Sequence, residues 1–375
     1  MTDLGVGLIG SGFIGKVHAL AYRSAPAVFD LPRLPRLEQL ADVDAGIAAA
    51  AAAAFGFATS TDDWRSLVLN PRVDVVDITT PNHLHEEIAV AAINAGKHVY
   101  CEKPLAPNAD GARRMRDAAA AGGVHTMVGF NYLKNPITGL AREIIAGGEI
   151  GDVYTYRGAH FEDYMHDPDT LVNPWRLRTD AGDGVTSDLG SHAISLARYL
   201  IGDIEAVIGH RITVVPERSV AGGATVKVGV PDTVNAHIRF QNGATGTLDA
   251  SWMAPGHKHT ISVEVWGTHG ALSFDFERLN ELRLYKAGQA RGREGFTTIL
   301  AGPSHPDYAA FIPAPGHQLS FVDLKTIEIR DLLAGLADHA PAPWPDFAEA
   351  YEVQRVVDAI IRSDQSGAWV PIADI

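Results

Sequence analysis

Short apolar runs and longer helix-like segments alternate along the first third of the chain. The runs are mainly apolar, as in strands, although the second is only weakly so, and the segments between them resemble helices. The predicted elements are a strand at residues 6–9, a helix that extends to Ala21, a strand that ends at Asp42, a strand at 73–78, a helix at 84–95 and a strand at 97–101. Alternation of strand and helix is typical of a parallel, doubly wound sheet, so we predict an α/β fold.

The pattern changes from about residue 150, where apolar and polar positions alternate. This period of two is typical of strands with one buried face, and glycines mark the turns between them. The segment QNGA, residues 241–244, is a hairpin turn signal. The predicted strands lie within residues 152–163, 233–252, 260–276 and 281–288. A second sheet therefore follows the first one along the chain.

Length and charge limit the class of protein. At 375 residues the chain is long for one domain, and two domains are expected. Its net charge of -14 argues against binding to nucleic acid or to an anionic membrane, so a small molecule is the expected partner. No stretch has the roughly 18 apolar residues of a membrane span, and the opening segment has an acid where a secretory signal has bases. We expect a cytoplasmic protein.

Three glycines follow the first predicted strand in the spacing G-x-G-x-x-G. They are Gly10, Gly12 and Gly15, and a helix-like segment comes next. In this context the first glycine permits a tight turn, the second lets the backbone approach a pyrophosphate, and the third lets helix and strand pack closely. The exposed N–H groups at the start of the helix then face the phosphates. The motif predicts a dinucleotide site.

An acid at the end of the second strand would hold the ribose hydroxyls of the dinucleotide. Asp42 takes this place 27 positions after Gly15, where about 20 is usual, and a proline-rich insertion before the strand accounts for the difference. Asp44 is the alternative. Position 43 is Val43, so neither acid has a basic neighbour to hold a 2′-phosphate. The sequence therefore favours NAD over NADP.

Two polar motifs come directly after predicted strands. They are TTPNHLH, residues 79–85, and CEKP, residues 101–104. The carboxyl ends of the strands form the edge at which a doubly wound sheet binds its ligands. Pro104 restricts the backbone of Lys103 to an extended conformation, so the direction in which this side chain leaves the backbone is fixed. Lys103 is thus a candidate catalytic residue.

A second candidate group lies on a predicted helix that ends at Gly202. Asp188 and His192 are four residues apart near its start and share one face. Histidine exchanges protons near neutral pH, and a nearby carboxylate orients its ring. Such pairs also occur as surface salt links, and it is the combination with Lys103 and a dinucleotide site that favours alcohol oxidation. No metal is expected, because Cys101 is the only cysteine and no histidine spacing typical of zinc is present.

These motifs resemble those of the glucose-fructose oxidoreductase, inositol dehydrogenase and MocA family, abbreviated Gfo/Idh/MocA. The matching segments are GSGFIG, TTPNHLH, CEKP, VGFNY at residues 128–132, WR at 175–176, SDLGSH and the run at 353–372. The resemblance implies an NAD-binding Rossmann domain at residues 1–130 and an α/β domain at 131–345, which binds substrate and carries a large, mostly antiparallel sheet. The open face of that sheet would form a homodimer or homotetramer, and a final helix at 346–363 would pack back on the first domain.

The resemblance also implies roles for single residues. Lys103 would bind the reacting hydroxyl and be joined to Pro104 by a cis bond. His192 would be the acid/base, with Asp188 as its partner or as a substrate ligand. Cofactor contacts would come from Gly10, Gly12, Phe13, Ile14, Asp42, Thr80, Pro81, Asn82, His85, Glu102 and Lys103.

Aromatic and polar side chains in the middle of the chain suit a sugar ring. They are Phe161, Tyr164, Trp175, His160, Glu162, Asp163 and Arg176. The candidate substrate residues are Tyr132, Asp163, Trp175 and Arg176. No dense basic cluster marks a phosphate site, so a neutral cyclic sugar or polyol is the favoured substrate. A phosphorylated substrate is not excluded, because four basic residues lie in this part of the chain or near it: Arg157, Arg176, Arg178 and Lys134.

The segment HFEDYMHDPD followed by NPWR most resembles the levoglucosan dehydrogenases and related NAD-dependent sugar 3-dehydrogenases, with inositol dehydrogenases next. Where many family members have an arginine and an aromatic residue after GFNY, this chain has Leu133 and Lys134, which leaves the substrate contacts there open.

The predicted function is oxidation of a secondary hydroxyl of a cyclic sugar or polyol by NAD. One alternative is a glycosidase that uses NAD for transient oxidation and elimination, and another is an NADP-dependent sugar reductase. A third is a catalytically silent cofactor sensor or corepressor. Silent relatives lose the lysine and the histidine, whereas Lys103 and His192 are both present here.

Overall fold

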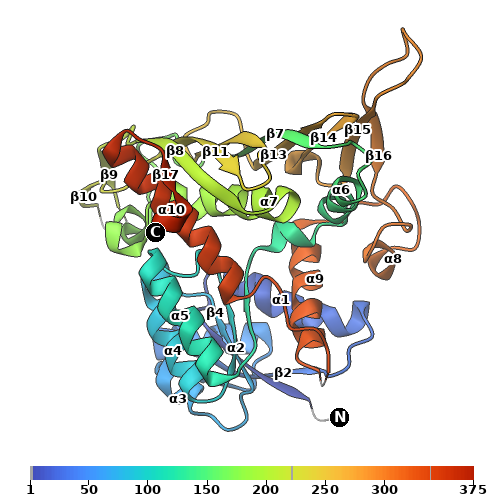
Figure 1. Ribbon diagram of the computed structural model, residues 1–375. Coiled ribbons are helices and arrows are strands. Elements are labelled where there is room, and N and C mark those ends of the chain that lie inside the picture. Colours follow the sequence, from blue (N-terminus) through green and yellow to red (C-terminus); the bar gives the residue numbers. More distant parts are fainter. Residues whose placement is uncertain (1–2, 221–222, 338) are drawn as a thin grey trace. The chain divides into compact units, whose positions relative to one another are not determined.

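The computed structural model describes residues 3–220, 223–337 and 339–375 (Figure 1). It divides into two compact units. The first unit comprises Met1–Lys134 and Ser320–Glu352, and the second comprises Asn135–Leu319 and Val353–Ile375. Each unit is built around its own sheet. Within the described residues, no helix combines the length and the apolar character needed to cross a membrane.

The first unit is built on a parallel sheet with the strand order β3-β2-β1-β4-β5-β6. The strands are β1 (Leu4–Ile9), β2 (Pro35–Ala41), β3 (Thr59–Thr61), β4 (Val75–Ile78), β5 (His98–Cys101) and β6 (Thr126–Val128). This is the order of a doubly wound fold, which binds ligands at the carboxyl ends of β1 and β4, where the strand order reverses. The parallel sheet predicted from alternating strands and helices is confirmed.

Helices cover both faces of this sheet. The side chains of β1 point alternately to one face and to the other, and each face packs against helices. Leu4, Val6 and Leu8 are buried on one face, in cores shared with residues of α1, α2 and α9. On the other face, a Cβ on Gly7 would lie 2.6 Å from Leu67 of α3, so the helix packs against bare backbone. The helices of the unit are α1 (Phe13–Val28), α2 (Ala45–Phe55), α3 (Trp64–Val68), α4 (His85–Asn94), α5 (Ala109–Gly122) and α9 (Phe321–Gly335).

The second unit is built on a mixed sheet with the strand order β16-β15-β14-β13-β7-β12-β11-β8-β17. β7 and β12 are parallel, and the other neighbouring strands are antiparallel. The strands are β7 (Val153–Phe161), β8 (Ile204–Ile212), β11 (Thr233–Phe240), β12 (Thr245–Ser251), β13 (Thr260–Gly267), β14 (Gly270–Asp275), β15 (Glu281–Lys286), β16 (Thr297–Leu300) and β17 (Val370–Pro371), and a separate pair is formed by β9 (Glu217–Ser219) and β10 (Thr225–Lys227). The expected large, mostly antiparallel sheet is confirmed.

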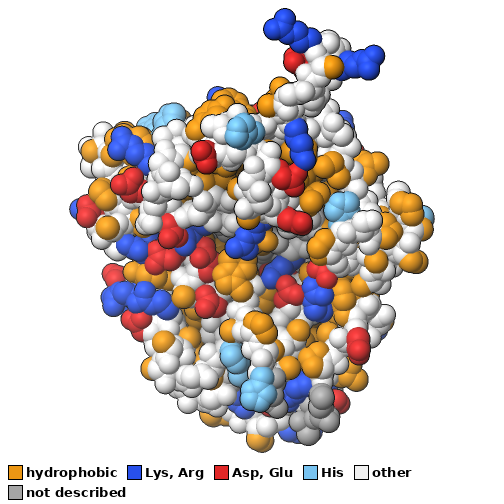
Figure 2. Space-filling model, turned by 45° about the vertical axis from the view of Figure 1, so that its right-hand side comes forward, with side chains coloured by type: hydrophobic (Ala, Val, Ile, Leu, Met, Phe, Trp, Pro, Cys, Tyr) orange, Lys and Arg blue, Asp and Glu red, His pale blue; other side chains and the backbone are white. Residues whose placement is uncertain are grey.

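One face of this sheet is covered by helices, and the other carries polar side chains. α6 (Pro136–Ala146) and α7 (Ser191–Ile201) lie on the covered face (Figure 1). Along β11, the exposed residues Asn235, His237 and Arg239 alternate with buried ones. The view in Figure 2 shows acidic and basic side chains mixed over the surface rather than gathered by sign. The remaining helices are α8 (Tyr308–Phe311) and α10 (Phe347–Ser366), of which the part from Val353 onward belongs to this unit.

The unit boundaries differ from those expected from the sequence. α9 lies in the range expected for the second domain, yet Ile329, Leu332 and Leu333 share a core with the first sheet. The final helix extends further than residues 346–363, and most of its length belongs to the second unit. The insertion expected before β2 starts within a helix, since α1 continues beyond Ala21 to Val28 and includes Pro26.

Candidate active site

The glycine-rich loop joins β1 to α1. Gly10 has a φ of +101°, a left-handed conformation that favours glycine. A Cβ on Gly15 would overlap the carbonyl oxygen of Gly10, so α1 packs on the loop only with glycine at this position. A Cβ on Gly12, by contrast, would meet no atom of the described residues within 4 Å. The space beside Gly12 is open, which fits the close approach of a pyrophosphate.

The start of α1 fits an anion as well. In the described part of the chain, no side chain caps this helix end, so its first N–H groups are available to phosphate oxygens. Phe13 and Ile14, two of the expected cofactor residues, form the first turn, and Phe13 is 77% exposed. The loop and helix start therefore have the features that the G-x-G-x-x-G spacing predicts.

Asp42 lies directly after β2, beside this loop. Its Oδ2 accepts hydrogen bonds from the backbone N–H of Ser11 at 2.8 Å and from the Ser11 hydroxyl at 2.5 Å. Asp44 instead caps α2, because its Oδ1 accepts from the N–H of Ile47 at 2.9 Å. The geometry therefore favours Asp42 over Asp44 as the ribose residue.

The segment after β4 reaches the same edge of the sheet. The Thr79 hydroxyl donates to the carbonyl oxygen of Gly10 at 2.7 Å, which ties the end of β4 to the glycine-rich loop. Thr80 and Pro81 follow, and Asn82 begins the short helix η1 (Asn82–Leu84). These residues lie where cofactor contacts were expected.

His85 is buried rather than exposed to a ligand. Its Nδ1 lies 3.0 Å from the carbonyl oxygen of Pro104, and its Nε2 lies 2.9 Å from that of Thr80. Burial lowers the pKa of His85, although the two carbonyls act in the opposite sense. His85 therefore joins the two loops after β4 and β5, which differs from the direct cofactor contact that the resemblance implies.

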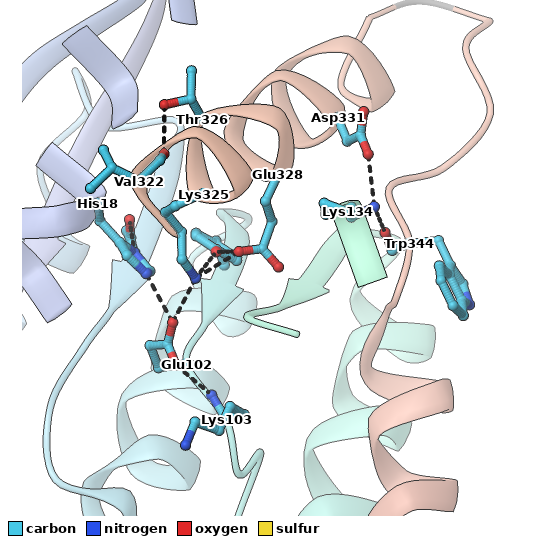
Figure 3. Close-up of polar contacts among 12 residues, drawn as sticks. His18, Glu102, Lys103, Lys134, Val322, Lys325, Thr326, Glu328, Asp331 and Trp344 are labelled. Atoms are coloured by element: carbon cyan, nitrogen blue, oxygen red, sulfur yellow. Dashed lines mark hydrogen bonds and ion pairs between the residues drawn. The ribbon is translucent and has the colours of Figure 1, made fainter. Parts of the chain in front are cut away.

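Lys103 lies just beyond the end of β5. Its bond to Pro104 is cis, as the resemblance implies. The residue is half-buried, and its backbone N–H donates to Oε2 of Glu102 at 3.1 Å. Figure 3 shows its side chain turned away from that carboxylate. The lysine thus has an anchored backbone at the ligand-binding edge of the first unit.

Glu102 faces the interior of the first unit. Its Oε1 accepts from Nε2 of His18 at 3.0 Å and from Nζ of Lys325 at 2.8 Å (Figure 3). Burial raises the pKa of Glu102, but Lys325 and His18 outweigh it and hold the pKa well below its usual range. A Cβ on Gly129 would overlap Glu102, so the glycine makes room for the carboxylate. The sequence did not reveal this contact, because Lys325 is 223 positions from Glu102.

In the second unit, Asp188 and His192 lie where a π-helix meets α7. The π-helix covers Thr186–Gly190, and α7 begins at the next residue. Such turns are rare and occur frequently at functional sites. His192 is 3% exposed, in the first turn of α7, and the Asp188 side chain is 20% exposed.

Asp188 brings together several candidate substrate residues. Its Oδ2 accepts from Nη1 of Arg176 at 2.9 Å and from the hydroxyl of Tyr164 at 3.4 Å. The Arg176 guanidinium lies 4.8 Å from the centre of the Trp175 ring. The Asp188 carboxylate raises the pKa of Arg176, although burial opposes this effect. The four side chains therefore form one polar and aromatic cluster.

Asp163 has another role. Its Oδ2 accepts from Nζ of Lys258 at 2.6 Å and from the N–H of Gly256 at 3.1 Å. Both partners belong to the loop between β12 and β13, so Asp163 holds that loop. It lies in the second unit with the Asp188 cluster, and these two hydrogen bonds are structural.

Tyr132 belongs to the first unit, in the short helix η2 (Asn131–Lys134). It is 6% exposed, and its ring centre lies 6.1 Å from that of Phe321. Lys134 donates to Oδ2 of Asp331 and to the carbonyl oxygen of Trp344, both at 2.7 Å. Lys134 therefore supports α9 and is not a candidate for ligand binding.

Arg178 and Arg157, two further basic residues that could bind a phosphorylated substrate, also have contacts within the protein. Arg178 donates to Oδ1 of Asp180 at 2.8 Å, and the Arg157 guanidinium lies 4.8 Å from the centre of the Trp266 ring. A phosphate would have to compete with these contacts.

His160, Glu162 and His259 place three possible metal-ligating atoms within 4.8 Å of one another. Oε1 of Glu162 lies 2.8 Å from Nδ1 of His259 and 3.3 Å from Nε2 of His160. Burial raises the pKa of Glu162, but hydrogen bonds from the two histidines lower it to about 2. The group is hydrogen-bonded as it stands and has donors that suit a divalent cation. This group could not be predicted from the sequence, because His259 is 97 positions from Glu162.

Two parts of the chain match known protein families. Residues 4–130 match a family described as an oxidoreductase family with an NAD-binding Rossmann fold. Residues 139–273 match the GFO/IDH/MocA C-terminal domain. The two matches correspond to the parallel sheet of the first unit and to most of the large sheet of the second.

Full-length relatives are also found. A levoglucosan dehydrogenase of Pseudarthrobacter phenanthrenivorans is 40% identical, and the match covers 100% of both chains. A solved structure of levoglucosan dehydrogenase in complex with NADH and levoglucosan has a TM-score of 0.96 at 40% identity and covers 100% of both chains. An NAD binding oxidoreductase from Klebsiella pneumoniae is 42% identical, with a TM-score of 0.94, and covers 99% of both chains.

Proposed function

Because this chain belongs to the Gfo/Idh/MocA family of oxidoreductases, we propose that it is an NAD-dependent dehydrogenase of cyclic sugars or polyols. The reaction is oxidation of a secondary hydroxyl group. Levoglucosan is the first candidate substrate, because the dehydrogenase that matches the chain from end to end carries that name. The observation that carries the proposal is that Lys103 and His192 are both present in a chain with this full-length match.

The first unit would hold the cofactor. NAD, when bound, supplies a hydride acceptor. The loop at Gly12 and the start of α1 would bind its pyrophosphate, and Asp42 would bind ribose hydroxyls. His85 would support this site indirectly, by fixing the two loops that follow β4 and β5.

Two side chains would manage the substrate hydroxyl. Lys103 would donate a hydrogen bond from Nζ to the hydroxyl oxygen and stabilise negative charge that develops there. A ring nitrogen of His192 would take the hydroxyl proton as general base. The O–H and C–H bonds break, a C=O bond forms, the proton remains on His192, and the hydride leaves with its electron pair. Asp188 would hold Arg176 as a donor to a second sugar hydroxyl.

We also propose that the chain forms a homodimer or homotetramer through the exposed face of the large sheet. Arg157 on β7 and Arg239 on β11 lie over Trp266 and Trp369, which gives this face aromatic surface as well as charge. Aromatic and arginine side chains are enriched in interfaces. Cytoplasmic location stays a prediction of the sequence.

A substrate panel tests the proposal. Levoglucosan, glucose, myo-inositol, scyllo-inositol and phosphorylated glucose and inositols are each offered with NAD or NADP, and absorbance at 340 nm is followed. We expect NADH to form with levoglucosan or another neutral sugar or polyol. With the phosphorylated compounds, and with NADP in place of NAD, kcat/KM should be lower by at least about tenfold.

Three other results would contradict it. Release of an aglycone without net NADH would indicate a glycosidase. Tighter binding of NADPH than NADH, with reduction of a ketose, would indicate a reductase. Binding of NADH without turnover of any sugar would indicate a cofactor sensor.

A further inference from the structure

Lys325 is a fully buried lysine of α9. Its Nζ lies 2.8 Å from Oε1 of Glu102, 2.6 Å from Oε2 of Glu328 and 3.0 Å from the hydroxyl of Tyr100. An ammonium group has three N–H donors, and these three acceptors use all of them. Burial lowers the pKa of Lys325, but the two carboxylates raise it above its ordinary value. Lys325 is therefore held as a cation in the interior of the first unit.

Glu102 connects Lys325 with Lys103. One carboxylate oxygen of Glu102 contacts Lys325, and the other accepts from the backbone N–H of Lys103. His18 donates to Glu102 as well, and its second ring nitrogen lies 2.9 Å from Asp77. Burial lowers the pKa of His18, but Asp77 and the hydrogen bonds raise it overall, which favours the protonated ring. Two cationic groups thus hold the Glu102 carboxylate.

A buried carboxylate next to a catalytic lysine has to be neutralised by a different cation if the lysine is to stay available to the substrate. A buried carboxylate without one is strongly destabilised, so it would attract the nearest ammonium group. For Glu102 that group would be the side chain of Lys103, the next residue in the chain. Lys325 pairs with Glu102 from within the unit, and Figure 3 shows the end of the Lys103 side chain apart from the carboxylate.

We propose that Lys325 is a positioning residue, which keeps the ammonium group of Lys103 directed at the substrate by holding and neutralising Glu102. Lys325 acts through Glu102 and is not itself a catalytic residue. The inference rests on the catalytic role proposed for Lys103. It assigns a function to α9, a helix more than two hundred positions from the motif it serves.

Lys134 offers a matched control. It is a largely buried lysine that attaches the same helix, since it donates to Asp331 of α9 and to the carbonyl oxygen of Trp344 (Figure 3). Neither of these partners is Glu102. Replacing Lys134 by Met removes comparable contacts to α9 and leaves Lys325 and Glu102 in place.

The first measurement is the acylation rate of Lys103 by a water-soluble N-hydroxysuccinimide ester, resolved by mass spectrometry of peptides. This rate does not depend on sugar turnover. We expect Lys325→Met to lower it by about fivefold or more, because Glu102 then pairs with the Lys103 ammonium. Lys134→Met should leave the rate within about twofold of the parent. NADH affinity and the thermal unfolding midpoint are measured on the same samples.

The second measurement is kcat with the sugar that the parent oxidises. We expect Lys325→Met to lower kcat by about tenfold or more and Lys134→Met to change it by less than about threefold. Adding Glu102→Gln to Lys325→Met removes the carboxylate charge next to Lys103 and keeps an acceptor for the Lys103 N–H. The double variant should therefore return to within about threefold of Glu102→Gln alone.

Equal acylation rates and kcat values in Lys325→Met and the parent would overturn the proposal, and so would equal losses in Lys325→Met and Lys134→Met. If Lys325→Met does not fold, the comparison of the double variant with Glu102→Gln decides: equal values support the proposal, and a further loss of about tenfold contradicts it. If the parent oxidises no sugar, the proposed function fails, and the acylation rates still decide the role of Lys325.

Discussion

Gly12 differs from Gly10 and Gly15 in what a side chain would meet. A Cβ on Gly15 would overlap the carbonyl oxygen of Gly10, and Gly10 itself has a φ of +101°. A Cβ on Gly12 would meet nothing within 4 Å among the described residues. The fold therefore needs glycine at the first and third positions, whereas the second position matters when a ligand approaches.

Substitutions by alanine should separate these two effects. We expect Gly15→Ala to lower the free energy of unfolding by about 1–3 kcal/mol, because the backbone must shift. Gly12→Ala should keep that free energy within about 0.5 kcal/mol of the parent and weaken NADH binding by about tenfold or more. Urea unfolding and a fluorescence titration with NADH measure the two quantities.

Gly139→Ala is the control, since a Cβ on Gly139 also meets nothing within 4 Å in the described chain. It lies on α6 of the second unit, away from the glycine-rich loop. A Gly12→Ala variant that binds NADH as tightly as Gly139→Ala would show that the open space at Gly12 is not used by the cofactor.

For single residues, the position directly after a predicted strand was enough to identify candidates for the ligand-binding edge. Gly10, Asp42 and Lys103 each come directly after a strand or one residue beyond it, and that position predicts a place at the ligand-binding edge. Lys325 could not be found in this way. Within DLKTIEIR it has the pattern of a charged helix position, and its burial depends on Tyr100, 225 positions earlier in the chain.

Among the elements, the segment from Thr186 to Ile201 differs from the single helix that the sequence predicts. Asp188 and His192 were expected on one face of an α-helix, but Asp188 lies in a π-helix that precedes α7. Hydrogen bonds in a π-helix span five residues rather than four, and helical spacing in the sequence does not reveal this change. Asp188 bonds to Arg176 and Tyr164, which the sequence placed near the site without linking them to Asp188.

The end of β7 supports a prediction on stability. Glu162 has a pKa of about 2 in the folded chain, below its ordinary value of 4.5, because hydrogen bonds from His160 and His259 outweigh the effect of burial. Its ionised form therefore stabilises the fold above about pH 4.5, and this contribution is lost as the pH falls from there toward 2. We expect Glu162→Gln to cost about 2–3 kcal/mol at pH 6 and less at each lower pH.

Urea unfolding of the parent and of Glu162→Gln at pH 6, 5, 4 and 3 measures this difference. Asp163→Asn is the neighbouring control, since Asp163 pairs with the exposed Lys258 and exposed ion pairs contribute little to stability. A difference between the parent and Glu162→Gln that stays constant from pH 6 to pH 3 would contradict the prediction.

For the whole molecule, the two kinds of sheet were predictable because their hydrophobic periods differ. Alternation of strand-like and helix-like segments indicated the parallel sheet, and alternation of apolar and polar positions indicated the large mixed sheet. The place of α9 was not predictable, because an apolar helix face fits either sheet. Contacts of Ile329, Leu332 and Leu333 within the core of Tyr22 and Met127 assign it to the first unit.

Lys103 belongs to the first unit and His192 to the second, and the proposed mechanism requires both to act on one hydroxyl group. The most direct test is kcat/KM of Lys103→Ala, His192→Ala and the double variant with the sugar that the parent oxidises. We expect each single substitution to lower kcat/KM by about 10²–10⁴-fold. The double variant should lose little more, because both groups serve one proton transfer. Single variants that bind NADH normally and stay within about twofold of the parent would contradict the mechanism.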